Sequence, residues 1–426
     1  MKIAIVGAGW AGMTAAVATT LAGHQAVVLE ASRILGGRAR ALNGYLPDGT
    51  PVVLDNGQHI LIGAYTESLR LMRTVGVNPD TSLLRLPLNL QFADGSGLAL
   101  PRWPSPFDAL AGMLRASGWS AADKWSLLRA SIVWQVQRFT CASHVTVADL
   151  CKTLTPRVVQ TLIDPLCVSA LNTPAERASG QVFLTVLRDS LFAGRGSSNL
   201  LLPTVDLTRL FPQAAAVWLQ ERGGEVRLGT RVERLHYDWQ WHIEGEKFDT
   251  VVWATSAQNA AQALVESAQA APEFIASALH AWAGTASGLQ HEAIATVYAW
   301  ASGARLRQPM LSLPSSPDAP AQFVFDRGQL GGPAGLLAFV VSASTADRET
   351  LQSQVLAQAQ SQLGLALQTV QTVVEKRATF ACTPGLLRPP MVVAPGLLAC
   401  GDYVEGPYPA TLEGAVRSGW AVGSLP

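Results

Sequence analysis

Residues 2–12, KIAIVGAGWAG, place a glycine-rich loop directly after a short run of apolar, partly β-branched residues. The alanine-rich segment 10–21 that follows predicts a helix, and residues 25–30 (QAVVLE) predict a second strand. A strand, turn, helix and second strand within about thirty residues form a parallel β-α-β unit. Glycine-rich loops occur in many unrelated proteins, so the ligand of this one is decided by residues farther along the chain.

The loop fits the pattern G-x-G-x-x-G at the junction of strand and helix. Gly7 permits a tight turn, Gly9 lets the backbone approach a pyrophosphate, and Gly12 lets the helix pack close to the strand. The first residues of the helix, Trp10 and Ala11, offer free N–H groups and the positive end of the helix dipole to phosphates. The pattern predicts a dinucleotide site, with a plain glycine-rich turn as the alternative.

Glu30 ends the second strand, with Ala31 beside it, where a carboxylate accepts hydrogen bonds from ribose hydroxyls. An acidic residue at this position disfavours a 2′-phosphate and therefore NADP. NAD and FAD remain at this point, and an ordinary surface glutamate is the alternative.

Composition limits the class of protein. The chain has 426 residues, 49% hydrophobic and 15% charged, with 31 basic and 31 acidic residues. This length allows one large domain or two interleaved ones, and the zero net charge argues against nucleic acid as a partner. Mean hydropathy is high at +0.22, but no run approaches the ~20 apolar residues of a spanning helix. We expect a cytoplasmic protein that contacts either a membrane or an apolar substrate.

The cysteines are odd in number and form no C-x-x-C pair, so neither a disulfide framework nor a zinc site is predicted. We expect five buried free thiols and no metal: Cys141, Cys151, Cys167, Cys382 and Cys400.

The next stretch, Gly36-Gly37-Arg38-Ala39, begins six residues after Glu30. An E-x(5)-G-G-R sequence after such a β-α-β unit resembles the second motif of FAD-binding proteins of the glutathione-reductase type, in their amine oxidase and carotenoid desaturase branch. The resemblance implies FAD, with Arg38 beside the pyrophosphate and Gly37 where the chain passes close to the flavin. A loop arginine paired with an acid is the alternative.

Two further stretches are similar to the same family. Residues 55–59 (DNGQH) resemble the segment that passes the flavin ring, which implies that Gly57, Gln58 and His59 face the isoalloxazine. Residues 229–232 (GTRV) resemble a strand whose valine, here Val232, holds the adenine end through backbone hydrogen bonds.

The closing motif of the family is matched by Gly401-Asp402 and by residues 409–415 (PATLEGA). The resemblance implies that Asp402 binds ribityl or phosphate groups. It also implies that a helix beginning at Thr411 and Leu412 faces the flavin and stabilises negative charge in the reduced ring. Thr411 as a plain helix cap is compatible with this role.

The sequence therefore predicts an α/β fold with a Rossmann-like FAD-binding domain of the glutathione-reductase type, assembled from separated segments, and an inserted α+β substrate domain. We assign the FAD-binding domain to residues 1–78, 201–256 and 381–426 and the substrate domain to 79–200 and 257–380. Within the first, residues 206–224 predict one amphipathic helix. The alternating segments 225–237 and 239–245 predict a small antiparallel sheet.

Amine oxidation is disfavoured, because amine oxidases of this branch usually carry a lysine near the flavin and this chain has none between Lys247 and Lys376. The inserted segments are poor in charge and favour an apolar substrate. Residues 101–119 (PRWPSPFDALAGMLRASGW) predict either a helix on a membrane surface, at the inner face of the cytoplasmic membrane, or a core helix with aromatic ends.

Residues 164–174 (DPLCVSALNTP), 178–183 (ASGQVF), 187–191 (LRDSL) and 409–419 resemble the bacterial squalene-associated FAD-dependent desaturases, now understood as hydroxysqualene dehydroxylases of hopanoid biosynthesis. The resemblance implies that a C30 allylic alcohol loses its hydroxyl and takes a hydride from N5 of reduced FAD, giving squalene. An ordinary buried helix is the alternative for the first stretch. A carotenoid or phytoene-type desaturase and a non-catalytic flavoprotein scaffold are the alternative functions.

A leaving hydroxide needs protonation, so a general acid near the flavin is expected to speed the reaction by ~10²–10⁴-fold. Four residues are candidates that the sequence does not rank: Asp55, His59, Asp164 and Asp189. No second G-x-G-x-x-G suggests an NADPH domain, so the electron donor stays open, as does the oligomeric state.

Overall fold

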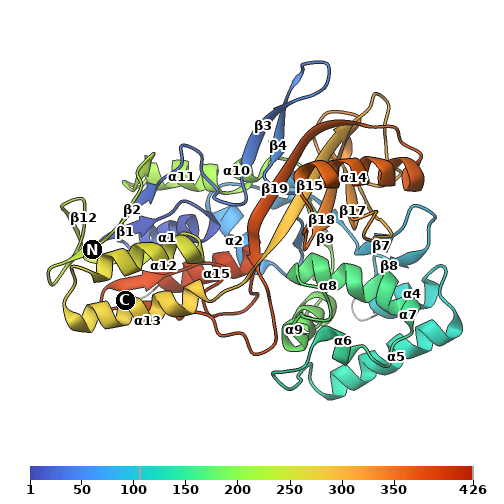
Figure 1. Cartoon of the computed structure of the whole chain (residues 1–426), viewed down its shortest axis with the longest axis horizontal. Helices are drawn as coiled ribbons and strands as arrows, with labels where there is room; N and C mark the ends of the chain where they lie inside the picture. Colours follow the sequence, from blue (N-terminus) through green and yellow to red (C-terminus); the bar gives the residue numbers. More distant parts are fainter. Residues whose placement is uncertain (105–106, 425–426) are drawn as a thin grey trace.

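The first thirty residues form the predicted unit with the predicted bounds. The computed structural model describes residues 1–104 and 107–424, and Figure 1 shows their arrangement. β1 (Lys2–Val6), α1 (Trp10–Leu21) and β2 (Gln25–Glu30) follow one another directly. The two strands pair in parallel inside a six-stranded sheet. The order of that sheet is β10 (Glu225–Leu228), β2, β1, β14 (Thr250–Trp253), β21 (Leu397–Ala399) and β20 (Val392–Ala394).

Helices cover both faces of this sheet, which explains why its strands are nearly continuous apolar runs. Ile3 and Ile5 of β1 belong to a core with α1, α11 (Pro212–Gln220) and α15 (Leu412–Gly423). Ala4 and Val6, which point the other way, belong to a core that includes α12 (Ala257–Ala268) and α13 (Glu273–Ser287). The parallel sheet and its neighbours confirm the predicted α/β class.

Three local predictions between residues 206 and 245 are wrong. Residues 225–228 join the parallel sheet beside β2, and only β11 (His236–Tyr237), β12 (Trp241–Ile243) and β13 (Glu246–Phe248) form the small antiparallel sheet. β10 is an edge strand with no buried residue, so its alternation mimics an antiparallel strand. Residues 229–232 are a loop that follows it.

The predicted helix at 206–224 is two helices, α10 (Leu207–Leu210) and α11. Pro212 lacks an N–H and disfavours helical backbone at Phe211, whose φ is −153°. The helix therefore restarts at Pro212 as its first residue, the position where proline is best tolerated.

A second, antiparallel sheet is built from later residues: β16 (Met310–Ser312), β17 (Phe323–Asp326), β18 (Leu336–Ser342), β15 (His291–Trp300) and β19 (Gln368–Phe380), in that order. α14 (Arg348–Leu363) packs on one face through Leu351 and Val355. The other face presents Phe323, Phe325 and Val340 to the larger core. The short helix η3 (Arg327–Gln329) joins β17 and β18.

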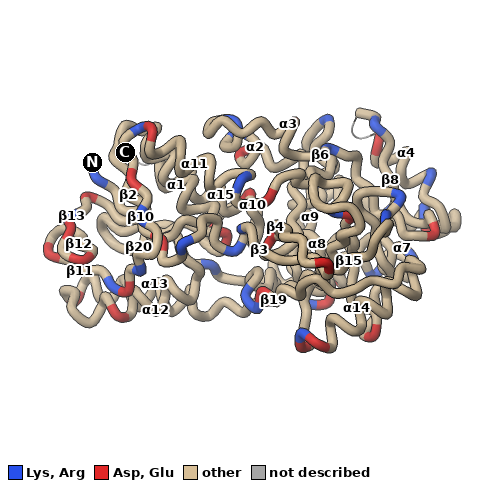
Figure 2. The backbone as a smooth tube through the Cα atoms, turned by 90° about the horizontal axis from the view of Figure 1, so that it is seen from above, with Lys and Arg blue, Asp and Glu red and all other residues tan. Residues whose placement is uncertain are grey.

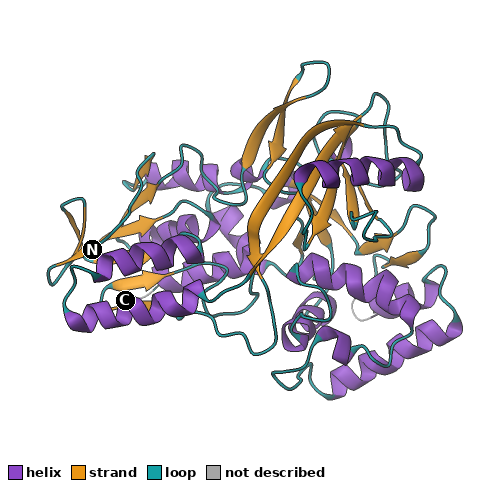
Figure 3. Ribbon diagram, viewed as in Figure 1, coloured by secondary structure: helices purple, strands orange, loops and turns teal. Residues whose placement is uncertain are grey.

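Residues 107–192 are helical and lie together at one end of the molecule (Figure 3). The elements are α4 (Phe107–Arg115), α5 (Ala121–Val136), α6 (Val147–Leu150), α7 (Pro156–Val158), the π-helical turn η1 (Val159–Ile163), α8 (Asp164–Leu171), α9 (Gly180–Leu187) and the π-helical turn η2 (Arg188–Phe192). Ser105 and Pro106 of the predicted membrane segment, and the last two residues of the chain, lie outside the described residues. Among the helices that are described, none is long and apolar enough to cross a membrane.

Short elements connect the two sheets. They are α2 (Thr66–Thr74), α3 (Pro79–Ser82), the hairpins β3 (Ala41–Tyr45) with β4 (Pro51–Asp55) and β7 (Asn89–Gln91) with β8 (Gly97–Ala99), and a three-stranded group of β5 (Leu61–Ile62), β9 (Leu200–Pro203) and β6 (Leu83–Leu86). The domain division given above stays a prediction.

Candidate cofactor and substrate site

A cavity of about 690 Å³ runs from the carboxyl ends of β1, β2 and β14 to α8 and the antiparallel sheet. Its size lies in the ~300–1,000 Å³ range of small-molecule and cofactor sites. Ligands of parallel α/β sheets bind outside the carboxyl ends of the strands, which is where the glycine loop lies.

The three glycines of the loop, Gly7, Gly9 and Gly12, are required for different structural reasons. Gly7 has a φ of +112°, and a Cβ there would lie 2.8 Å from the Ala254 oxygen. A Cβ at Gly12 would lie 1.9 Å from the Gly7 oxygen, so the turn and the helix need both glycines. At Gly9 the nearest atom to a Cβ would be Gly37 Cα at 4.0 Å, and Gly9 lines the cavity. Glycine at this position therefore keeps the cavity open.

Glu30 lines the cavity at the end of β2. Its two carboxylate oxygens accept hydrogen bonds from the N–H groups of Ala8 and Ser32, each at 2.7 Å. These bonds fix the carboxylate and leave further lone pairs for a ribose. Thr230 N–H donates to the Glu30 carbonyl at 2.8 Å, which brings the loop with Val232 to the same end of the cavity.

Arg38 and Asp402, 364 residues apart, form an ion pair of 2.6 Å inside the cavity lining. Arg38 also donates to the Ala378 carbonyl at 2.6 Å, so its guanidinium is fixed on two sides. The neighbouring Arg40 lines the cavity too, and its buried Nε has no hydrogen-bond partner among the described residues. A buried donor without a partner, a fixed cation and the open backbone at Gly9 fit the pyrophosphate of a dinucleotide.

The predicted cofactor residues converge on this cavity, apart from Gly12, which packs against Gly7. Those that line it are Gly7, Gly9, Trp10, Ala11, Glu30, Ala31, Gly37, Arg38, Gly57, Gln58, His59, Val232, Gly401, Asp402, Thr411 and Leu412. Sequence reasoning missed other lining residues on α12 and β19 and in the loop after Arg38: Arg40, Asn259, Gln262, Glu266, Glu375 and Thr379. They belong to no motif, and only the folded chain brings them here.

His59 lines the cavity as a neutral side chain. Its Nδ1 lies 2.8 Å from the Gly57 carbonyl, which only accepts, so Nδ1 carries the proton. Burial, together with the charge of Arg38, lowers the pKa of His59 despite that hydrogen bond. The remaining nitrogen, Nε2, is then an acceptor, which makes His59 a poor proton donor.

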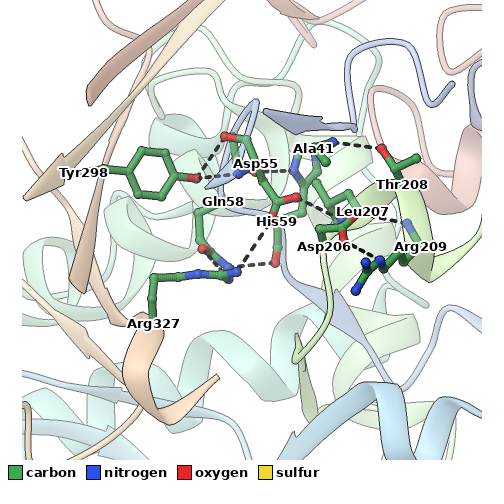
Figure 4. A network of polar contacts seen from close by, with 11 residues as sticks. Ala41, Asp55, Gln58, His59, Asp206, Leu207, Thr208, Arg209, Tyr298 and Arg327 are labelled. Atoms are coloured by element: carbon green, nitrogen blue, oxygen red, sulfur yellow. Dashed lines mark hydrogen bonds and ion pairs between the residues drawn. The ribbon is translucent and has the colours of Figure 1, made fainter. Parts of the chain in front are cut away.

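Asp55, at the end of β4, lies behind the cavity wall in the polar network of Figure 4. Its carboxylate accepts from Leu207 N–H at 2.9 Å and lies 3.7 Å from Arg327 Nη2. Arg327 Nη1 donates to Gln58 Oε1 at 3.1 Å, and Tyr298 Oη donates to the Asp55 carbonyl at 2.9 Å. Burial raises the pKa of Asp55 to about 6, against the opposing charge of Arg327. The network fixes residues 55–59, the segment that the family resemblance predicts beside a flavin.

The N-terminus of α15 also faces the cavity. Thr411 caps the helix by accepting from Gly414 N–H at 3.0 Å. Glu413, fully buried, accepts from the N–H groups of Glu67 and Ser68 and pairs with Arg417 at 2.8 Å, so it anchors α2 to α15. The helix is thus fixed with its free N–H groups toward the cavity.

A second, smaller cavity of about 110 Å³ adjoins the first, and we call it the apolar chamber. The two share Ile60, Tyr65, Ser169, Ala170, Phe323 and Thr411. Leucine, isoleucine, valine and methionine side chains make up most of the remaining lining. Asp189 carries the one carboxylate among the described lining residues. Asp55 and Asp164 line neither cavity, although burial raises the pKa of Asp164.

Comparison with known proteins agrees with this architecture. Residues 10–422 match the flavin containing amine oxidoreductase family. The chain is 26% identical to hydroxysqualene dehydroxylase of Zymomonas mobilis, covering 99% of this chain and 98% of that protein. It is 24% identical to zeta-carotene desaturase of Arabidopsis thaliana over 61% of this chain and 48% of the relative.

Among solved structures, the cyclohexylamine oxidase of Brevibacterium oxydans superposes with a TM-score of 0.68 at 16% identity, covering 99% of this chain and 98% of that one. The fold is therefore the same, although β15, like the rest of the chain between Lys247 and Lys376, contains no lysine. The chain belongs to the flavin-containing amine oxidoreductase family.

Proposed function

We propose that this protein is an FAD-dependent oxidoreductase that replaces the hydroxyl of hydroxysqualene by hydrogen and yields squalene. The observation that carries the proposal is the apolar chamber, which adjoins the cofactor cavity and whose described lining residues include a single carboxylate. Relatives of nearly equal length named hydroxysqualene dehydroxylase support it. The substrate is then a C30 isoprenoid with one polar group, which matches a lining with one acid.

FAD would lie along the larger cavity, with its adenosine end at Glu30 and Val232 and its pyrophosphate between the glycine loop and Arg38. Asp402 and the N-terminus of α15 would hold the ribityl chain and the flavin. When bound in its reduced form, FAD supplies the hydride for the new C–H bond. The apolar lining excludes bulk water, which strengthens the interactions of the few polar groups in the chamber.

A carotenoid-type desaturase is the second candidate, because desaturases also resemble this chain. Their similarity covers a smaller share of both chains than that of the dehydroxylases. A flavoprotein that binds squalene-pathway enzymes without catalysis is the third.

Product analysis separates the three. We would reduce the FAD-loaded protein with dithionite under anaerobic conditions, add hydroxysqualene, and follow flavin absorbance and products by mass spectrometry. We expect squalene and oxidised flavin in equal amounts. Conjugated products formed from a polyene by the oxidised enzyme would favour the desaturase. Flavin that stays reduced with every isoprenoid alcohol would favour the scaffold.

We also propose that the exposed face of α4 binds an anionic membrane. Trp103, Phe107, Leu110 and Leu114 are all exposed, with fractions from 44 to 63%. Asp108 of the same helix is buried, whereas Arg115 is exposed and lies over the Trp103 ring at 5.1 Å. Figure 2 shows further basic residues around this end of the molecule. Apolar and basic side chains on one surface helix are typical of interfacial binding.

Sedimentation with vesicles tests this surface. The triple variant Phe107→Ser/Leu110→Ser/Leu114→Ser should lose binding to phosphatidylglycerol vesicles that the unchanged protein shows. Zwitterionic vesicles should bind the unchanged protein more weakly, because each basic residue adds about 1 kcal/mol only at an anionic surface. The control Val217→Ser/Leu387→Ser, which removes exposed apolar residues elsewhere, should bind normally. Equal binding by the triple variant would exclude α4.

A further inference from the structure

The apolar chamber contains a hydrogen-bonded acid pair on its wall. Tyr408 Oη donates to Asp189 Oδ2 at 2.8 Å, across 219 residues of sequence. Both residues line the chamber, together with Thr411, which also lines the cofactor cavity. The pair therefore lies in the wall of the chamber, and Thr411, whose hydroxyl donates to the Tyr408 carbonyl, connects it to the lining of the cofactor cavity.

Both partners come from unusual backbone. Asp189 lies in the π-helical turn η2, a feature that is rare and frequent at functional sites. Tyr408 has a φ of +55°, in the left-handed region that non-glycine residues seldom adopt. Its carbonyl accepts from Thr411 Oγ1 at 2.7 Å, so the helix cap fixes its position. Such backbone clusters where side-chain placement is functional.

Two cations flank the pair. Arg188 Nε lies 2.7 Å from Asp189 Oδ1, and its side chain is half exposed. The Arg417 guanidinium lies 5.0 Å from the centre of the Tyr408 ring. Burial and the bond to Asp189 raise the pKa of Tyr408 to about 12, so its phenol keeps the proton throughout the physiological range.

We propose that Tyr408 is the catalytic acid that protonates the departing hydroxyl, and that Asp189 binds that hydroxyl and returns a proton to Tyr408. The inference rests on the proposed function and deepens it. As the C–O bond breaks, its electron pair stays on oxygen, and the phenol proton converts that oxygen to water. Bound reduced FAD would supply the hydride for the new C–H bond and would serve as the two-electron donor. Tyr408 then regains a proton from solvent through Asp189, whose partner Arg188 faces the solvent.

The test uses Tyr408→Phe, which removes one oxygen, with Tyr237→Phe in β11 as the matched control. Each protein is loaded with FAD and checked for flavin content and spectrum. Single-turnover reoxidation of the reduced flavin by hydroxysqualene should slow by ~10²–10⁴-fold in Tyr408→Phe and stay unchanged in the control. Asp189→Asn, which accepts a hydrogen bond but relays no proton, should slow turnover at least roughly 10-fold.

A second substrate separates proton donation from positioning. In the acetate ester of hydroxysqualene the leaving group is the acetate ion, which is stable without protonation. Tyr408→Phe should therefore reoxidise its flavin with this ester nearly as fast as the unchanged enzyme does. A third readout involves no turnover. The oxidised enzyme is titrated with hydroxysqualene and, separately, with squalene, and binding is followed by the flavin absorbance. The ratio of the two dissociation constants, which measures the preference for the alcohol, should fall roughly 10-fold in Asp189→Asn.

Each other result is informative. Full-rate turnover of the alcohol by Tyr408→Phe overturns the proposal, as does an equal slowing on alcohol and ester. If Tyr408→Phe does not retain FAD, the rates of Asp189→Asn with the alcohol and with the ester test the proposal instead, and an unchanged rate with the alcohol or an equal slowing with both overturns it. If the unchanged enzyme holds FAD but never oxidises it with hydroxysqualene, the proposed function fails and the acid assignment with it.

Discussion

The cofactor cavity and the apolar chamber that adjoins it are built in different ways. At the glycine-loop end, backbone makes the site: Gly7, Gly9 and Gly12, the start of α1 and the fixed carboxylate of Glu30. At the chamber end, side chains from helices and from the antiparallel sheet make it, and its polar pair joins residues 189 and 408. A phosphate is recognised by backbone geometry that short motifs encode, whereas a flexible isoprenoid is recognised by a cavity shape that no motif encodes.

Replacing either Gly9 or Gly12 by valine should have the largest effect, on FAD retention in the first case and on folding in the second. Gly9 has an ordinary φ of −74° and open space around a Cβ, so Gly9→Val should fold and yet lose FAD almost completely. Gly12→Val should fail to fold, because its Cβ would overlap the Gly7 oxygen. Circular dichroism and flavin absorbance after purification measure both properties. A yellow Gly9→Val protein would contradict the assignment of the cavity to FAD.

This contrast also explains what the sequence predicted. The β-α-β unit followed from a local pattern, and the family resemblance of short motifs picked out residues that line the larger cavity, because Gly, Glu and Arg at fixed spacing have few other uses after a strand. The edge strand β10 was misread because half-exposed parallel strands alternate like antiparallel ones. Neither the Arg327 network nor the partnership of Tyr408 was foreseen, because both join residues more than 200 positions apart.

The ion pair of Asp55 and Arg327 lies behind the cavity walls and joins the end of β4 to η3, the short helix between two strands of the antiparallel sheet. Both side chains are at least 95% buried, at 2% and 5% exposure. Arg327→Met should therefore lower the free energy of unfolding by about 3–5 kcal/mol, because it leaves a buried carboxylate without its counter-charge.

Urea unfolding measures the change, with the exposed Arg348→Met as the control, expected within about 0.5 kcal/mol of the unchanged protein. The double variant Asp55→Asn/Arg327→Met should recover part of the loss, because no buried charge remains. A double variant as unstable as the sum of the single ones would show that the pair is not coupled.

The same aspartate predicts a pH dependence. Burial raises the pKa of Asp55 to about 6 in the folded protein, above its value of about 4 in an unfolded chain. The folded state then binds the proton more tightly than the unfolded chain does. The contribution of Asp55 to the free energy of unfolding is therefore fully present below pH ~4 and is lost as the pH rises through 6. Each unit of difference corresponds to about 1.4 kcal/mol.

Unfolding at pH 4.5 and 7.5 tests the sign. Asp55→Asn cannot titrate but still offers an oxygen to Leu207 N–H, so its stability should fall less over this interval than that of the unchanged protein. A steeper fall in Asp55→Asn would mean that the ion pair with Arg327, rather than burial, dominates the carboxylate.

The smallest expected effect is a loss of stability on substitution of Thr411, which lines both cavities. Thr411→Ala removes a helix cap and should cost about 1 kcal/mol of stability. Thr146, which caps α6 within the helical region and accepts from Asp149 N–H at 3.1 Å, is the matched site. Thr411 differs because its hydroxyl also donates to the carbonyl of Tyr408.

If Thr411 is only a cap, Thr411→Ala and Thr146→Ala should lose similar stability and keep full turnover. If it also fixes the strained backbone of Tyr408, Thr411→Ala should in addition slow flavin reoxidation by hydroxysqualene, and Thr411→Ser should restore the rate. Equal rates in both alanine variants would separate the cofactor end from the chamber. A selective loss at Thr411 would show that the N-terminus of α15 also positions Tyr408, the acid that we propose.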